Sequence, residues 1–147
     1  MNTKEAKKLL RKAKDNARLG NGGGKLVTSL RKQGLSEDEI GIRVGRKTCT
    51  ITLEDVLNQW ELQDGRCDDS NVVIDASLLF SKRNPWAPSI DRVDNKIGYE
   101  PGNIRIVLSL WNTARGETPI GVWKNKLKQF YSYFCSVYGY GPEKKAL

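Results

Sequence analysis

The stretch PSIDRVDNKIGYEPGNIRIVL, residues 88–108, decides the fold. It contains two short runs of strand-like composition, Ser89–Val93 and Asn103–Leu108, on either side of a loop with Gly and Pro. Ser109 follows directly and can cap a helix that carries Asn112. The sequence therefore predicts a compact strand–loop–strand–helix unit. Together with the helices expected on both sides, this unit predicts an α+β fold.

Capping signals and apolar periodicity predict further elements upstream of this unit. We expect a helix over 4–19, a second over 25–33 and a third opened by Ser36. An extended segment at 48–51, a helix over 53–63 and a short strand at 72–74 should follow.

A last helix is predicted downstream. Thr118 is its expected N-cap, Pro119 its first residue and Gly139 its end. Large apolar residues recur on one face at helical spacing, which is typical of a helix packed on a core. We therefore expect core packing for Ile120, Trp123, Leu127, Phe130, Tyr131, Phe134 and Tyr138.

Positive charge is concentrated in the first third of the chain. Residues 1–47 hold 13 Lys or Arg against five Asp or Glu, whereas residues 48–147 hold 12 of each. Such an excess is typical of a solvated helix or of a surface that binds a polyanion, and we favour nucleic acid. The candidate contacts are Lys7, Lys8, Arg11, Lys12, Arg18 and Arg105, and a solvated charge is an equal alternative for Arg105.

The pattern predicts four segments. Residues 1–24 form a basic helical arm, too polar for a core helix, that ends in a Gly-rich hinge. Residues 25–50 form a helical DNA-contacting segment with a weak resemblance to the first two helices of a helix-turn-helix. Residues 51–139 form the domain that contains the strand–loop–strand–helix unit, and residues 140–147 form a tail.

The composition excludes several kinds of site. The chain has no His, so His-based zinc sites, Ser–His or Cys–His nucleophile pairs and imidazole bases are excluded. Its three Cys, at positions 49, 67 and 135, form no C-x-x-C pair, and we interpret them as packing residues. No apolar run is long enough to span a membrane and no secretory signal is visible. We expect a soluble, cytoplasmic protein without a membrane partner.

Two oxygen donors are expected to meet in the strand–loop–strand–helix unit. Asp91 lies near the end of the first strand and Asn112 lies on the helix. Carboxylate and amide oxygens suit a hard divalent cation, Mg²⁺ or Mn²⁺. Such a cation would bind a scissile phosphate and activate water.

The segments PSIDRVD (88–94) and GYEPGNIRIV (98–107), followed by Asn112, resemble a group of phage and bacterial HNH endonucleases. The helix and turn at residues 52–67 resemble the region that precedes the catalytic finger in the same group, so the resemblance covers about residues 51–135. It implies a ββα-metal finger that cleaves DNA, in the host cytoplasm if the chain is phage-encoded.

Carried over residue by residue, the resemblance implies that Asp91 and Asn112 bind the metal ion. It implies that Asn103 holds the loop between the strands through hydrogen bonds to its backbone. Arg92 occupies the general-base position, where most relatives have His. Cys67 stands alone where zinc-stabilised relatives have C-x-x-C, so no structural zinc is expected.

Arg92 cannot act as a base, because its pKa is above about 12, but it can stabilise charge on phosphate oxygens in the transition state. The nucleophile would then be metal-activated water or the phenolic oxygen of Tyr99. A packed or phosphate-contacting Tyr99 is the favoured alternative to a catalytic one. Asp94 is a turn residue or a partner of Arg92, and Glu117 caps the last helix or completes the metal shell.

Three functions remain open at this point: a Mg²⁺-dependent DNA endonuclease, a catalytically silent nucleic-acid-binding protein of the same fold, and an RNA-binding or RNA-cleaving module. The joint presence of Asp91 and Asn112 favours the endonuclease. Replacing either residue by Ala is then expected to abolish cleavage and leave the fold intact. Formation of a homodimer is also open.

Overall fold

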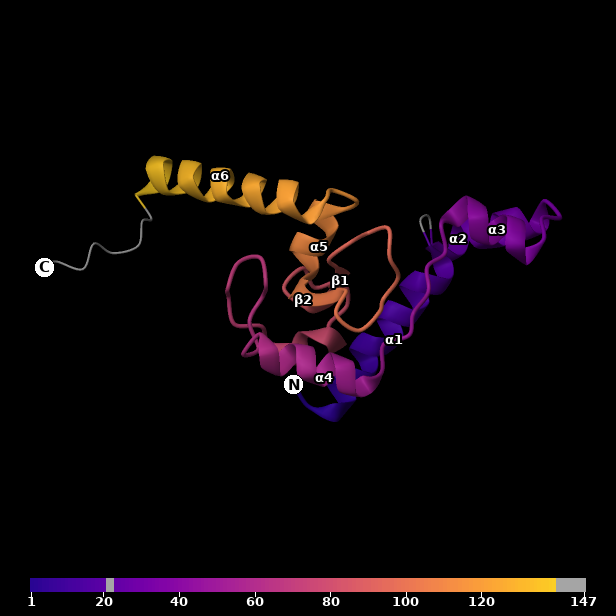
Figure 1. Ribbon diagram of the computed structural model, residues 1–147, viewed down its shortest axis with the longest axis horizontal. Helices are drawn as coiled ribbons and strands as arrows, with labels where there is room; N and C mark the ends of the chain where they lie inside the picture. Colours follow the sequence, from indigo (N-terminus) through magenta and orange to yellow (C-terminus); the bar gives the residue numbers. More distant parts are fainter. Residues whose placement is uncertain (21–22, 140–147) are drawn as a thin grey trace, which may run out of the picture.

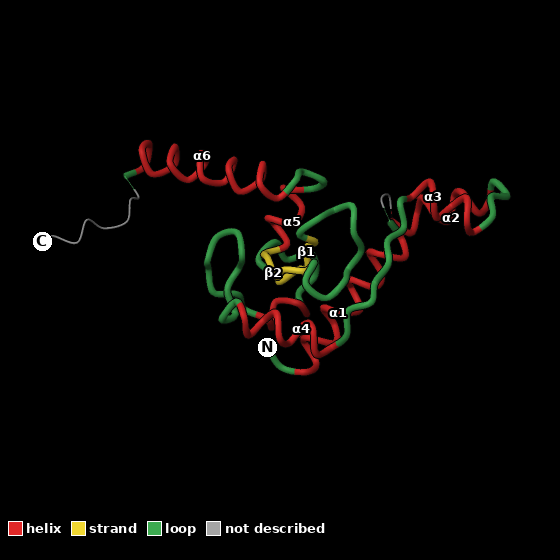
Figure 2. Tube along the Cα trace, viewed as in Figure 1, coloured by secondary structure: helices red, strands yellow, loops and turns green. Residues whose placement is uncertain are grey.

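The computed structural model describes residues 1–20 and 23–139. The structure combines helices with a two-stranded sheet, which confirms the α+β class (Figures 1 and 2). In chain order the elements are α1 (Thr3–Leu19), α2 (Gly23–Lys32), α3 (Glu37–Val44), α4 (Leu53–Leu62), η1 (Ala76–Phe80), β1 (Pro88–Arg92), β2 (Ile104–Leu108), α5 (Ser109–Arg115) and α6 (Ile120–Tyr138).

The two strands and α5 form a ββα unit, as the sequence predicts. β1 pairs with β2 in antiparallel register, with Asp91 opposite Arg105 and Arg92 opposite Ile104. α5 begins immediately after β2 and packs on both strands. Every residue of β2 is buried. The side-chain amide of Gln63, at the end of α4, bonds to both the N–H and the carbonyl of Ile106, so the outer edge of β2 is covered.

The loop between the strands is fastened to the extended segment before α4. The N–H of Tyr99 donates to the Thr48 carbonyl at 2.9 Å, and the N–H of Thr50 donates to the Tyr99 carbonyl at 2.9 Å. Gly98 permits this approach, because a Cβ at that position would overlap Thr48. The segment 48–51 predicted to be extended therefore holds the loop between the strands in place, although it forms an isolated bridge rather than a strand.

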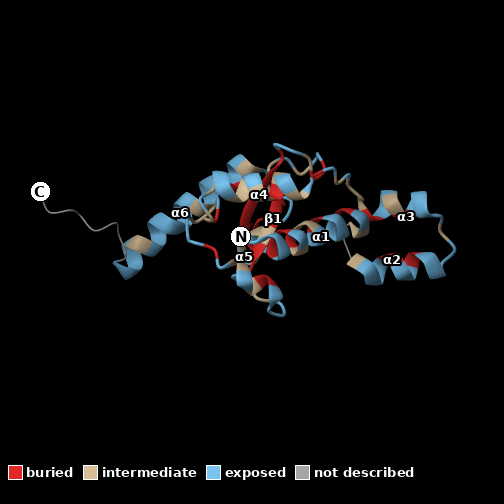
Figure 3. Ribbon diagram, turned by 90° about the horizontal axis from the view of Figure 1, so that it is seen from below, coloured by how far each residue is buried: buried red, intermediate tan, exposed pale blue. Residues whose placement is uncertain are grey.

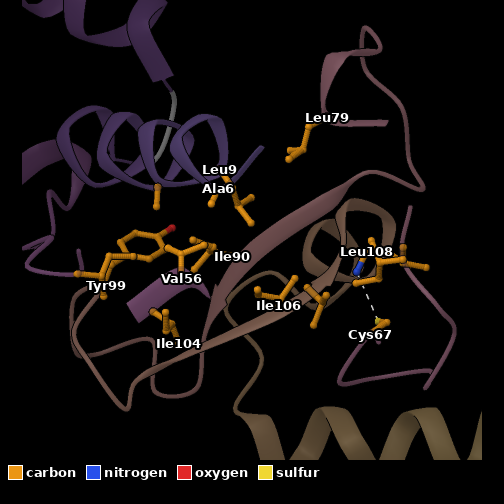
Figure 4. Packing of buried hydrophobic residues seen from close by; sticks show 14 of the residues in the cluster. Ala6, Leu9, Val56, Cys67, Leu79, Ile90, Tyr99, Ile104, Ile106 and Leu108 are labelled. Atoms are coloured by element: carbon orange, nitrogen blue, oxygen red, sulfur yellow. Dashed lines mark hydrogen bonds between the residues drawn. The ribbon is translucent and has the colours of Figure 1, made fainter. Parts of the chain in front are cut away.

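α1 belongs to the main core, which corrects the prediction that this basic arm is too polar for a core helix. One face of α1 buries Ala6, Leu9, Ala13 and Ala17 in the same apolar cluster as the strands and α4 (Figure 4). The lysines lie on the opposite face, toward solvent. The narrow apolar stripe can therefore pack on the core although the helix as a whole is polar. Residues 21–22 of the predicted hinge and the tail at 140–147 lie outside the described residues.

α2 and α3 form a small hairpin at the far end of α1 (Figure 1). It has a separate apolar cluster of Val27, Leu30, Ile40 and Val44. Ser36 caps α3 through a capping box with Glu39, as predicted.

α6 departs most from the sequence prediction. Trp123 is buried, but the other five aromatic residues of α6 are all exposed (Figure 3). Two caps and one strand also differ. Pro119 is the N-cap residue of α6, so Thr118 lies before it, and Ser109 is the first residue of α5 rather than its cap. Residues 72–74 form only an isolated bridge.

No helix among the described residues is long and apolar enough to cross a membrane.

Candidate functional site

A polar hollow of about 290 Å³ lies where the end of α1 meets the ββα unit. It brings together four residues that the sequence considered for chemistry: Arg92, Tyr99, Asn112 and Glu117. Residues of the N-terminal region complete the wall, which was not anticipated: Asn16, Gly20, Gly45 and Lys47.

Arg92 is held in place at the hollow. Its Nη1 donates to the carbonyls of Asn95 at 3.0 Å and Ile97 at 3.2 Å, and its guanidinium lies 5.3 Å from the centre of the Tyr99 ring. Nη2 is 3.7 Å from a carboxylate oxygen of the exposed Glu117. A largely buried guanidinium with fixed orientation is thus available to an anion in the hollow.

Tyr99 is buried beneath Arg92. Burial raises the pKa of its phenol, and the positive charge of Arg92 and a hydrogen bond with Asn16 offset this rise only in part. The phenol is therefore protonated near neutral pH. This arrangement supports the packing interpretation of Tyr99 over a role as nucleophile.

Asn103 makes the backbone hydrogen bonds that were expected of it. Its Oδ1 accepts from the N–H of Asp94 at 2.9 Å, and its Nδ2 donates to the carbonyls of Asp94 at 3.1 Å and Gly98 at 2.8 Å. Three bonds from one buried side chain close the loop between β1 and β2. Asn103 does not line the hollow, so it acts by positioning the loop that carries Tyr99.

The amide of Asn112 is oriented by β1. Its Nδ2 donates to Ser89 Oγ at 2.8 Å and to the Ile90 carbonyl at 3.2 Å. With the nitrogen engaged in this way, Oδ1 is the atom of this amide that remains to bind a ligand in the hollow.

Asp91 does not line the hollow, and the predicted pairing of Asp91 with Asn112 around a metal ion is not assembled. One carboxylate oxygen, Oδ2, accepts from Arg105 Nη2 and from Arg115 Nη1, both at 2.7 Å. The other oxygen, Oδ1, accepts from the N–H of Arg92 at 2.9 Å. A divalent cation at this carboxylate would lie beside two guanidinium groups, so Asp91 as arranged does not fit a metal ligand.

Arg105 is buried, which corrects both expectations for it, a nucleic-acid contact and a solvated charge. Its guanidinium binds Asp68, Asp69 and Asp91. Burial opposes its charge, but the bonds to Asp69 and Asp68 outweigh this effect and raise the pKa of Arg105. The sequence offered a signal for this network, because the acidic pair 68–69 had no other assigned role.

Of the residues that the sequence considered as metal ligands, Asn112 and Glu117 line the hollow, and they offer Asn112 Oδ1 and the Glu117 carboxylate as oxygen donors. Mg²⁺ typically retains several waters and binds one or two protein oxygens together with substrate phosphate. This sparse donor set therefore fits such an ion when phosphate supplies the other ligands. In the part of the chain that the structure describes, no group of three or more Asp, Glu, Cys or His residues could hold a metal. Cys67 is buried, and its sulfur accepts from the N–H of Leu108.

A second, basic hollow of about 330 Å³ lies on α1 beside η1. Lys4 and Lys8 place their ammonium groups 5.1 and 4.3 Å from the centre of the Phe80 ring. Three predicted nucleic-acid contacts meet there with two residues that the sequence did not single out, in the set Lys4, Lys7, Lys8, Arg11 and Phe80.

The other predicted contacts on α1, Lys12 and Arg18, are exposed outside this basic hollow. Partial desolvation lowers the pKa of Lys12, and the charge of Lys8 lowers it further. Positive charge is thus crowded on the solvent face of α1, as a polyanion-binding surface requires.

Comparisons of the chain with protein-family models, with curated proteins and with solved structures found no match.

Proposed function

We propose that this chain is a metal-dependent DNA endonuclease that hydrolyses phosphodiester bonds in the polar hollow, with its ββα unit as an HNH-type ββα-metal finger. One observation carries the proposal: Arg92 of β1, Asn112 of α5 and Glu117 after α5 line a single polar hollow. Cytoplasmic location, in the host cell if the chain is phage-encoded, is part of the same proposal.

Arg92 and Lys47 bind the scissile phosphate. Both residues line the hollow. Glu117 neutralises their positive charge only weakly, because its carboxylate is exposed to solvent. Arg92 is fixed by two loop carbonyls and by the Tyr99 ring, so little reorganisation is needed when negative charge grows on the phosphate oxygens. Tyr99 acts by holding this guanidinium.

Asn112 and Glu117 would hold Mg²⁺ or Mn²⁺. The bound ion would supply a Lewis acid for the phosphate and lower the pKa of a water molecule. This chemistry requires no imidazole, which agrees with the absence of His from the chain. The basic hollow on α1 contributes affinity for the DNA backbone without taking part in chemistry.

A second candidate is a catalytically silent nucleic-acid-binding protein of the same fold. The position of Asp91 favours it, because Arg105 and Arg115 supply the positive charge beside this carboxylate that a metal ion would otherwise supply. In that case Arg92 and Lys47 bind phosphate without hydrolysis.

Incubation with supercoiled plasmid, with Mg²⁺ or with EDTA, tests the proposal. We expect nicking that requires Mg²⁺ and is lost in Asn112→Ala and Glu117→Gln. Glu61→Gln, an exposed residue on α4, is the matched control and should cut normally. DNA binding without cleavage by the wild type would contradict the endonuclease proposal and support the catalytically silent binding protein. Preferential binding or cleavage of a matched RNA would overturn the assignment of DNA as the substrate.

A further inference from the structure

α6 carries an apolar stripe with the spacing of a coiled coil. Residues on this face recur at alternating intervals of four and three, the pattern by which one helix packs along another. The stripe consists of Trp123, Leu127, Phe130, Phe134 and Val137, with Tyr131 and Tyr138 along its edge.

Beyond Trp123, most of this stripe is exposed in the part of the chain that the structure describes. Trp123 is buried, with its ring 6.2 Å from that of Trp111 and its indole N–H bonded to Asp69. Farther along the helix, Phe130 is 54% exposed and Tyr138 is 61% exposed. None of the other described helices and strands packs extensively on α6, which projects from the ββα unit (Figure 1).

An apolar groove runs along α6 from Lys124 to Phe134. Its volume is about 670 Å³, and its walls are α6 on one side and residues 68–70 with Trp111 on the other. Leu127, Tyr131 and Phe134 extend the stripe into this groove. A concave apolar surface of this kind suits inserted aromatic side chains better than it suits the flat surface of a membrane.

The charges of α6 indicate what the occupant is. Lys124, Lys126 and Lys128 lie in the first half of the helix, the second half has no charged residue, and α6 has no acidic residue at all. In an antiparallel pair of such helices, the basic half of each lies opposite the uncharged aromatic half of the other. Like charges then stay apart, whereas a parallel pair would bring the lysines together.

We propose that α6 pairs in antiparallel fashion with α6 of a second copy of this chain, so that the aromatic second half of each helix lies in the groove of the other. Taking about 200 Å² for a whole aromatic residue, the exposed parts of Phe130, Tyr131 and Tyr138 amount to roughly 370 Å² per copy. The remaining groove walls, Leu127, Trp111 and residues 68–70, add to this area. The total is smaller than the about 800 Å² per partner of a standard interface, which suits a reversible dimer. This inference does not depend on the proposed nuclease function.

The mass of the full chain in solution, measured by sedimentation over a wide range of concentration, tests the proposal. We expect a monomer–dimer equilibrium, with the dissociation constant raised about tenfold or more in Phe130→Glu. Gln129→Glu adds the same charge one position away, outside the groove, and should dimerise like the wild type. A wild type that stays monomeric, or equal weakening by both substitutions, would overturn the proposal.

Disulfide formation tests the orientation. In a Cys135→Ser background, mixed chains carrying Val122→Cys or Tyr138→Cys should cross-link with each other, because an antiparallel pair brings these positions together. Cross-linking of position 138 to itself would indicate a parallel pair and contradict the model of charge separation. Sedimentation of monomers with anionic vesicles, in place of dimer formation, would identify a lipid surface as the occupant and overturn self-association.

Discussion

The carboxylate of Asp91 lies 2.7 Å from the guanidinium of Arg115, and both side chains are almost fully buried. The pair joins β1 to the last turn of α5, and Arg105 of β2 binds the same carboxylate oxygen. One acidic side chain thus connects all three elements of the ββα unit. Its removal would leave two buried guanidinium groups without this partner.

Asp91→Ala is therefore expected to lower the free energy of unfolding by about 3–5 kcal/mol, because it breaks a buried ion pair from one side. This expectation replaces the one drawn from the sequence, that the substitution leaves the fold intact. Urea denaturation followed by tryptophan fluorescence measures the change. Asp15→Ala, which removes a surface pair with Arg18, is the control and should cost less than about 1 kcal/mol. An Asp91→Ala protein as stable as the wild type would contradict a stabilising role for these ion pairs.

Asn103→Ala should lower stability and loosen the loop between the strands. It removes three hydrogen bonds from a buried side chain and leaves backbone groups of Asp94 and Gly98 without these partners, which costs about 1–3 kcal/mol. Amide hydrogen exchange should become faster in residues 94–102. Asn95→Ala, which removes one exposed bond to Gly116, should leave that exchange unchanged.

Tyr99 should titrate above the ordinary range of a tyrosine, because burial raises its pKa. The folded state holds this phenol protonated, so its contribution to stability is complete below about pH 10 and is lost as the pH rises through the higher folded-state pKa. Absorbance at alkaline pH, compared between the wild type and Tyr99→Phe, measures the titration of this phenol.

Tyr99→Phe should still cleave DNA. Loss of all activity together with a trapped protein–DNA adduct in the wild type would instead identify the phenol as nucleophile.

The pH profile of cleavage should show no inflection near 6.5, because the chain has no imidazole to act as base. Activity should rise steadily above neutral pH as water becomes easier to deprotonate. A bell-shaped profile centred near neutral pH would indicate a general base in the protein that is not among the residues assigned to the hollow.

Arg92→Lys should retain the charge but lose the fork that binds the loop carbonyls and phosphate oxygens together. We expect a loss of cleavage rate of roughly 10²-fold, and a larger loss for Arg92→Ala. Single-turnover kinetics separates this effect from binding. Arg66→Lys, at a more exposed site that also donates to a loop carbonyl, is the control. Unchanged cleavage by Arg92→Ala would exclude a role for Arg92 in the transition state.

The basic hollow on α1 should contribute a salt-dependent part of DNA affinity. Lys7→Gln and Arg11→Gln are each expected to reduce the slope of log affinity against log salt by about 0.9, the value for one phosphate contact. Point substitutions replace deletion of residues 1–24, because α1 is part of the core. Lys126→Gln on α6 should leave the slope unchanged. Equal slopes in all variants would mean that these cations face solvent only.

Local interactions were predicted well from the sequence. The capping boxes that open α3 and α4 join residues three positions apart, and Asn103 binds a loop within ten residues of itself. Arg92, Tyr99 and Asn112 were also selected correctly as residues that meet at one site. Motifs of this kind depend on the order of residues along a short segment, which the sequence states directly.

The partners of buried charges could not be predicted in the same way. Asp91 could face a metal ion or an arginine, and both choices satisfy the same motif. The structure places it between Arg105 and Arg115, which are 14 and 24 residues away, and leaves Glu117 at the hollow instead. Asn16 and Lys47 carried no motif at all, and only the packing of α1 brings them to the site.

The sequence by itself determined the α+β class, the order of the elements and which faces of the helices are apolar, because hydrogen bonding within a turn and side-chain periodicity are local properties. Only the tertiary structure decided what each apolar face meets. The thin stripe of α1 is buried in the core, whereas the broad aromatic stripe of α6 is left open beyond Trp123. Burial depends on the surface that arrives from elsewhere in the chain, and that is set by the competition of all the segments for the same core.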